Sequence, residues 1–209
     1  MGRSPTNTKA KLLETANELI WKSSYGSVSV AEICKCSGVN KGSFYYYFSS
    51  KSELAATVME EAYQMYEPEL IKVLSSPVPA IKCFENLASF FYEEQQAALQ
   101  KYGRVCGCPF ASLGSEMAGS EELIRKKVDE IINRQEEVFG KSLQQMIDSG
   151  YLPSETNIST TASDLHIFIM GSMMMARIQN DLTGLKSNME SGFIRILGLN
   201  RLVAEEELI

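Results

Sequence analysis

The sequence lacks the features of a membrane-spanning or exported chain. Its 209 residues contain no run of eighteen apolar residues and no leader of basic, apolar and small residues. The five cysteines are an odd number for a disulfide framework, so reduced thiols are expected. We therefore expect a cytoplasmic protein without a membrane partner.

Motifs for catalysis or metal binding are also lacking. There is no phosphate-binding glycine loop, nucleophile elbow or His–carboxylate set, and acidic pairs such as Glu93–Glu94 point to different sides of a helix. The single histidine, His166, offers too few partners for tetrahedral zinc, and we interpret it as a satisfied core or interface residue. We expect no enzyme, no metal and no cofactor.

Alternating strand patterns are absent, whereas apolar residues recur at helical spacing throughout, which predicts an all-α fold. The clearest break is Ser75–Pro79, and Pro68 is expected to bend or end the first part of the helix that precedes this break. The predicted helices are Thr8–Ser23, Val30–Ser37, Lys41–Phe48, Lys51–Leu74, Ala80–Leu99, Pro109–Met117, a long helix from Ser120 towards Gly150, Ser159–Leu182 and Ser187–Leu202. The first nine residues are interpreted as a frayed arm.

The residues from Ser29 to Phe48 predict a helix-turn-helix. Ser29 and Glu32 have the spacing of a capping box, Gly38 suits the left-handed end of a helix, and Asn40 suits the cap of the next. Phe44 and Phe48 then share one helical face.

The second helix of this motif has more tyrosines than one short core can bury. Ser43, Tyr45, Tyr46 and Tyr47 spread around the remaining surface, and hydroxyls with Lys41 suit phosphate oxygens. A helical hairpin whose tyrosines cover a neighbouring helix is the alternative.

Charge is divided unevenly along the chain. Residues 1–56 carry a net charge of +3, whereas the whole chain carries −6, which leaves −9 for the remainder. A basic head on an acidic body favours contact of the head with phosphates.

The segment SVAEICKCSGVNKGSFYYYFSSKSEL, from Ser29 to Leu54, resembles the DNA-binding segment of the TetR family of bacterial repressors. The resemblance implies that Lys41, Ser43, Tyr45 and Tyr46 face the operator and that Lys51 holds a phosphate. We add Ser29 and Gly42 of the same motif. The predicted DNA-contact set is then Ser29, Lys41, Gly42, Ser43, Tyr45, Tyr46 and Lys51.

The same resemblance implies the domain organisation. Residues 1–50 would form a three-helix DNA-binding head, and residues 51–209 a helical ligand-binding and dimerisation body that begins with a linker helix, 51–74. The last two helices would form a homodimer that spans a palindromic operator, with Gly171, Ser172 and Ala176 allowing close approach and Met173 and Met175 filling gaps. Core packing within one subunit is the alternative.

Two body segments, Gly107–Ala118 and Gly171–Leu185, resemble the ligand-binding domains of one TetR branch with a G-C-x-x-x-x-L-x-x-E element. This resemblance implies a pocket for a small-molecule inducer, although apolar residues of this kind are more often plain core than pocket wall. The candidate pocket residues are Phe84, Phe91, Cys108, Phe110, Met146, Phe168 and Met174.

Cys106 and Cys108 form a C-x-C pair beside two glycines and Arg104. A nearby cation could lower the pKa of a thiol here, and a flexible backbone could expose the thiolate. Cys108 directly precedes Pro109, where a helix is predicted to start. The free amides and the positive dipole end of that helix would favour the thiolate of Cys108 over its thiol. The resembling branch includes regulators that sense electrophiles or oxidants at the position of Cys108. A buried structural cysteine is the alternative.

Together these features predict a DNA-binding transcriptional regulator, a repressor released by a small lipophilic or electrophilic inducer. The alternative is a ligand-independent DNA-organising protein on the same fold.

Overall fold

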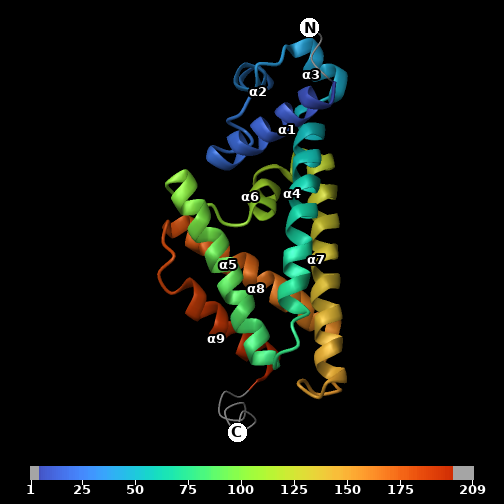
Figure 1. Ribbon diagram of the computed structural model, residues 1–209, viewed down its shortest axis with the longest axis vertical. Helices are drawn as coiled ribbons and strands as arrows, with labels where there is room; N and C mark the ends of the chain where they lie inside the picture. The colour runs from blue at the N-terminus through green and yellow to red at the C-terminus, as the bar shows by residue number, and fades with distance from the viewer. Residues whose placement is uncertain (1–4, 200–209) are drawn as a thin grey trace. The chain divides into compact units, whose positions relative to one another are not determined.

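The computed structural model describes residues 5–199, and over this range the chain forms nine α-helices and no strand (Figure 1). The predicted all-α class is therefore confirmed. The helices are α1 Pro5–Lys22, α2 Val30–Ser37, α3 Lys41–Tyr47, α4 Lys51–Leu74, α5 Ala80–Tyr102, α6 Pro109–Met117, α7 Glu122–Asp148, α8 Ile158–Gln179 and α9 Leu185–Leu197.

The chain divides into two compact units, which are described separately. The first contains α1 to α3, α4 as far as Met65, and the segment Pro109–Ile131 with α6 and the start of α7. The second contains Tyr66–Cys108 and the chain from Ile132 onward. This division groups α6 with the three helices of the expected head. None of the described helices is long and apolar enough to cross a membrane.

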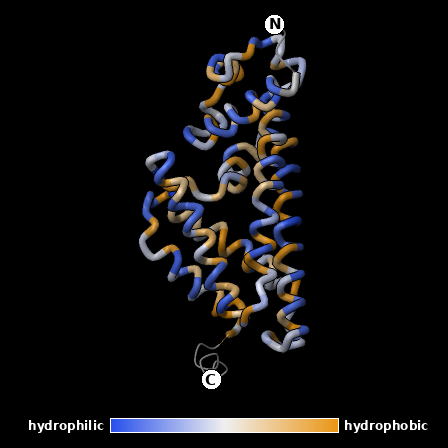
Figure 2. The backbone as a smooth tube through the Cα atoms, in the orientation of Figure 1, coloured by the Kyte–Doolittle hydropathy of each residue, from blue (hydrophilic) through white to orange (hydrophobic). Residues whose placement is uncertain are grey.

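The first unit is organised around the core of the helix-turn-helix. Leu12, Ile33, Phe44 and Leu54 are completely buried and belong to one hydrophobic cluster. Apolar positions recur between hydrophilic ones along the helices (Figure 2), as expected of helices that bury one face.

The predicted caps of the motif are confirmed. The Ser29 side chain accepts a hydrogen bond from the Glu32 amide at 3.1 Å, and Asn40 Oδ1 accepts one from the Ser43 amide at 2.8 Å. Gly38 ends α2 in the left-handed region, with φ 65°, which glycine adopts without a steric penalty.

Three predicted boundaries need correction. Helix α1 begins at Pro5, so the expected frayed arm is partly helical. Helix α4, by contrast, spans Lys51–Leu74 as predicted and includes Pro68. Helix α8 ends at Gln179 because Asn180 takes a left-handed cap, and α9 ends at Leu197 because Gly198 does the same.

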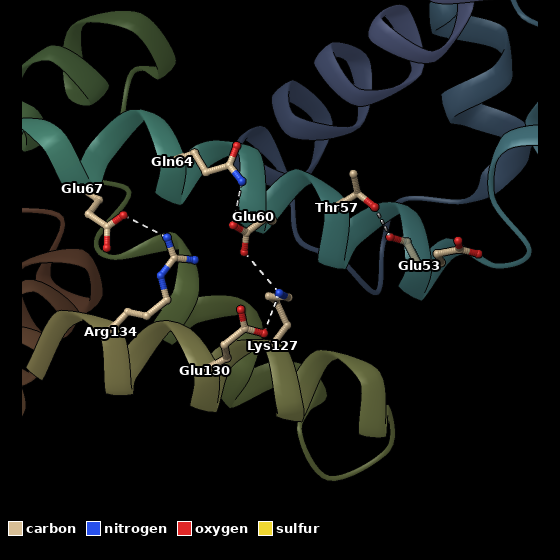
Figure 3. Close-up of polar contacts among 8 residues, drawn as sticks. All are labelled: Glu53, Thr57, Glu60, Gln64, Glu67, Lys127, Glu130 and Arg134. Carbon is tan, nitrogen blue, oxygen red and sulfur yellow. Dashed lines mark hydrogen bonds and ion pairs between the residues drawn. The ribbon is translucent and has the colours of Figure 1, made fainter. Parts of the chain in front are cut away.

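Ion pairs join α4 to α7 within each unit (Figure 3). In the first unit, Lys127 Nζ lies 3.2 Å from Glu60 Oε2 and 2.7 Å from Glu130 Oε2. In the second, Arg134 Nη2 lies 2.9 Å from Glu67 Oε2. Burial lowers the pKa of Lys127, but the two carboxylates outweigh it and raise this pKa above its ordinary value. These partly buried pairs are less screened than pairs on an open surface.

The second unit buries aromatic residues where α9 packs against α5 and α8. The Phe193 ring lies 5.3 Å from that of Phe84 and 5.8 Å from that of Phe168. Gly192 is required here, because a Cβ at this position would lie 2.0 Å from the Phe168 ring.

His166 on α8 is buried in the second unit, but it is not satisfied as expected. Its Nδ1 has no hydrogen-bond partner among the residues that the structure describes. Burial lowers the pKa of His166, and the charge of Glu136 acts in the opposite direction with a smaller effect. The folded protein therefore favours the neutral imidazole.

We predict that acidification destabilises the protein through His166. The histidine pKa is about 6.5 in the unfolded chain and lower in the fold, so below about pH 6.5 the unfolded state binds more protons. The free energy of unfolding should fall with pH from 7.5 to 5.5, by at most about 1.4 kcal/mol per pH unit, and fall less in His166→Gln. Urea denaturation at several pH values measures this difference, and parallel curves for the two proteins would refute it.

Candidate nucleic-acid interface

Helix α3 presents a polar face outward and an apolar face inward. Phe44 and Phe48 are buried in the head core, as the sequence predicts, whereas 81% of Tyr46 and 57% of Tyr45 are exposed. Lys41 is exposed at the start of the same helix. Two aromatic hydroxyls and an ammonium thus lie on a rigid element, where they can donate to an external acceptor.

The neighbouring residues of α3 are less exposed. Ser43 is half-buried, and Tyr47 is partly buried against the head core, with its ring centroid 5.0 Å from that of Tyr46. Tyr47 therefore supports the core and Tyr46, and does not spread outward as the sequence suggested. Gly42 is exposed, as is the N-cap Ser29 of α2.

Lys51 makes several contacts within the first unit. Its Nζ donates to the carbonyl oxygens of Tyr25 and Val28, each at 2.9 Å, and lies 3.8 Å from the centroid of the Tyr25 ring. The expected phosphate contact of Lys51 stays a prediction, and in this structure the Lys51 ammonium holds the turn between α1 and α2. Burial lowers the pKa of Lys51, with Glu116 and Glu121 opposing.

Glu116 on α6 reaches the same turn. Its Oε2 accepts a hydrogen bond from the Tyr25 amide at 3.1 Å, and its Oε1 accepts one from the Gly26 amide at 2.6 Å. A Cβ at position 26 would lie only 2.7 Å from Glu116 Oε1. Gly26 is therefore the residue that lets the carboxylate approach the backbone, a role beyond the helix stop that the sequence suggests.

We call residues 25–28 the α1–α2 corner. It is held by Lys51 from α4 and by Glu116 from α6, all within the first unit. Tyr25 is 98% buried, and burial is the main reason that its pKa is raised to about 12, so the ring beneath the Lys51 ammonium stays neutral. Sequence reasoning missed Glu116, although it is the final residue of the G-C-x-x-x-x-L-x-x-E element.

The candidate inducer residues do not form one described site. Phe110 belongs to the first unit, with its ring 6.0 Å from that of Tyr63, and the remaining candidates belong to the second. Phe84, Phe91, Met146 and Cys108 are buried, and Met174 is half-buried.

Phe168 is half-buried in the second unit and packs beside Phe193, which also contacts Phe84. It lines a groove of about 370 Å³ together with Gly171 and Met175 of α8 and Leu185 at the start of α9. Phe168 therefore borders both this groove and the aromatic cluster, and its role in an inducer pocket stays a prediction. The small Gly192 draws its ring onto α9.

The C-x-C segment is held rigidly and is not exposed. Gln95 accepts a hydrogen bond from the Gly107 amide at 2.7 Å and donates to the Gly107 carbonyl at 3.2 Å, and Arg177 donates to the Cys106 carbonyl at 3.2 Å. Both cysteines are at least 96% buried. Burial raises the pKa of the Cys106 thiol despite the opposing charges of Arg104 and Arg177. The expected flexible backbone and exposed thiolate are thus contradicted for Cys106.

A helix-turn-helix with capped helices and an exposed tyrosine-rich second helix defines this all-α chain as a DNA-binding regulator. Two family profiles match it: bacterial regulatory proteins, tetR family, over residues 12–58, and tetracyclin repressor-like, C-terminal domain, over residues 87–191. The chain belongs to the TetR family of transcriptional regulators.

Individual relatives agree with this family. An uncharacterised helix-turn-helix regulator of Lactococcus lactis is 25% identical over 88% of this chain and 90% of its own. The repressor NemR of Escherichia coli is 26% identical over 59% of this chain and 60% of its own.

Solved structures share the fold. The reduced form of E. coli NemR superposes with a TM-score of 0.74 at 21% identity, covering 91% of this chain and 97% of that one. A TetR-family regulator of Cytophaga hutchinsonii superposes with a TM-score of 0.80 at 17% identity, covering 96% of this chain and 99% of that one.

We predict that Glu116 and Gly26 contribute to stability through one shared interaction. Glu116→Ala removes the acceptor, and Gly26→Ala displaces it with a methyl group, so each should lower the free energy of unfolding by about 1 kcal/mol. The double variant should lose about as much as either single variant. Urea denaturation of the four proteins measures the coupling.

Gly119→Ala is the matched control for this cycle. A Cβ at Gly119 meets no atom within 4 Å, so this variant reports only the effect of replacing a glycine on the unfolded chain. Additive losses in the double variant would show that Glu116 and Gly26 act independently.

Proposed function

We propose that this regulator is a repressor that binds a palindromic operator as a homodimer in the cytoplasm and is released by a small lipophilic or electrophilic inducer. The observation that carries the proposal is the exposed face of α3, where Tyr45 and Tyr46 are directed away from a well-packed core. Relatives named as repressors, NemR of E. coli and DhaR of a Mycobacterium species, support this direction of regulation.

Six residues of the predicted contact set remain in the proposed interface. In this proposal, Tyr45, Tyr46 and Lys41 reach the DNA directly, and Gly42 lets the backbone approach a phosphate. The six residues are Ser29, Lys41, Gly42, Ser43, Tyr45 and Tyr46.

The proposed dimer uses an exposed apolar face of α8. Ile167 is 65% exposed, Met175 51% and Ile178 68%, and with Gly171 they recur at spacings of three and four residues. Met173 and Ala176, expected on this face, are instead buried within the subunit. A second copy would cover the exposed stripe and bring two heads to the two halves of a palindrome.

The proposed route from inducer to DNA passes through α6. Glu116 binds this helix to the α1–α2 corner, so a shift of α6 would have to move the corner or break two hydrogen bonds. Cys108 directly precedes α6, which makes it the thiol whose modification would displace that helix.

The class of inducer has two alternatives. A thiol buried to 96% needs a transient opening before an electrophile can reach it, whereas a lipophilic molecule could bind without covalent change. The proposal includes no catalytic activity.

Binding to DNA from the protein's own promoter tests the repressor function. Tyr45→Ala and Tyr46→Ala should each weaken specific binding by about 5- to 150-fold, the equivalent of the roughly 1–3 kcal/mol expected for a lost specific contact. Tyr151→Ala, an exposed tyrosine of the second unit, is the control that should bind normally. Sedimentation should find two wild-type chains per palindrome and monomers for Gly171→Arg.

The inducer arm adds lipophilic compounds, a maleimide or hypochlorite to the operator complex of wild type, Cys106→Ser and Cys108→Ser. Release of wild type and Cys106→Ser, but not Cys108→Ser, by the reactive compounds would identify electrophile sensing. Equal release of all three by a lipophilic compound would identify non-covalent induction. A complex that no compound releases would favour the ligand-independent DNA-organising alternative.

A further inference from the structure

A groove of about 580 Å³ on the head joins α3 to a helix outside the predicted DNA-contact set. It is lined on one side by Ser43, Tyr46 and neighbouring residues of α3, and on the other by Thr8 and Lys11 of α1. Helix α1 packs against both α2 and α3 in the first unit (Figure 1). The exposed face of α3 therefore continues onto α1.

Lys11 differs from two other lysines of the head in what its ammonium contacts. The Lys51 ammonium is hydrogen-bonded to two carbonyl oxygens, and that of Lys9 lies 5.8 Å from the centroid of the Phe48 ring. Lys11 is half-buried at the groove, and within residues 5–199 it has neither a hydrogen bond nor an ion pair. The Lys11 ammonium therefore lies at a surface groove and has no counter-ion among the described residues.

The lining of the groove suits an anionic oxygen. None of its described lining residues is acidic, and hydroxyl groups come from Thr8, Ser43 and Tyr46. The turn at its floor contributes Gly38, where a Cβ would meet no atom within 4 Å, so an external group can approach the backbone. An ammonium and several hydroxyls around an open turn are the donors that commonly contact DNA phosphates.

We propose that Lys11, with Thr8 beside it, binds a phosphate of the DNA backbone and supplies the contact that the sequence assigned to Lys51. The DNA interface then spans α1 and α3, and Lys51 acts on DNA only by holding the corner. This inference rests on the proposed DNA-binding function and deepens it. The contact is with the backbone, so it adds affinity without sequence preference.

Salt dependence of DNA binding tests this assignment, because each phosphate contact contributes about −0.9 to the slope of log affinity against log salt. Lys11→Ala should weaken binding to the operator and to an unrelated duplex by the same factor and reduce the magnitude of the slope by about 1. Lys11→Arg should keep the wild-type slope. A wild-type slope in Lys11→Ala would overturn the proposal.

Two lysine variants serve as matched comparisons. Lys9→Ala removes the same charge two residues away on α1 and should keep the wild-type slope, so an equal loss in Lys9→Ala would show a general charge effect and overturn the assignment. Lys51→Ala should lower the urea midpoint while the folded protein keeps the slope. A reduced slope in Lys51→Ala would return the phosphate contact to Lys51.

These measurements also distinguish a failure of the Lys11 assignment from a failure of the proposed DNA-binding function. If wild type prefers its operator and Tyr45→Ala loses that preference, the DNA-binding function stands whatever Lys11→Ala does. If wild type shows no affinity for DNA that depends on salt, both the function and this inference fail.

Discussion

The attachment of the α1–α2 corner is the constraint on which the head depends. The corner has no regular secondary structure, yet it sets the direction in which the chain enters α2 and therefore where α3 lies. Two hydrogen bonds from the Lys51 ammonium and two to the Glu116 carboxylate hold its backbone, and the Tyr25 ring lies beneath the ammonium. Charged groups form stronger hydrogen bonds than neutral ones, so these four bonds add to the burial of Tyr25 and Val28 in ordering the loop.

The same attachment gives α6 a mechanical role. Glu116 on α6 accepts two hydrogen bonds from the corner, so a displacement of α6 would act on the corner through these two bonds. Glycine at position 26 makes this contact possible, since any side chain there would meet the carboxylate. The proposed release mechanism thus depends on one carboxylate and one glycine, and needs no change in the core of the helix-turn-helix.

Local features of the head could be predicted from sequence because their causes lie within a few residues. The Ser29 and Asn40 caps, the left-handed Gly38 and the buried Phe44 each follow from short-range spacing. The partners of Lys51 could not be found in this way, since they lie 23 and 26 residues away, and those of Glu116 lie 90 and 91 residues away. A lysine in a DNA-binding motif suggests a phosphate until its actual neighbours are known.

The body shows the same limit. The C-x-C pair was expected to be mobile because glycines flank it, but Gln95 and Arg177 hold its backbone by hydrogen bonds, and both cysteines are buried. The packing of the Phe168 ring against Gly192 could not be predicted either, because the two residues lie on different helices. Residue type and helical periodicity predict that a residue lies on the apolar face of a helix. Which residue it then packs against depends on tertiary structure.

Hydrogen exchange at the Tyr25 and Gly26 amides tests the central claim most directly, because these two amides donate to Glu116. Both amides should exchange slowly in the wild-type protein and much faster in Glu116→Ala, while the amides buried within α2 and α4 keep their protection. Exchange in the wild type at the rate of an unstructured peptide, or equal protection in the two proteins, would contradict the account.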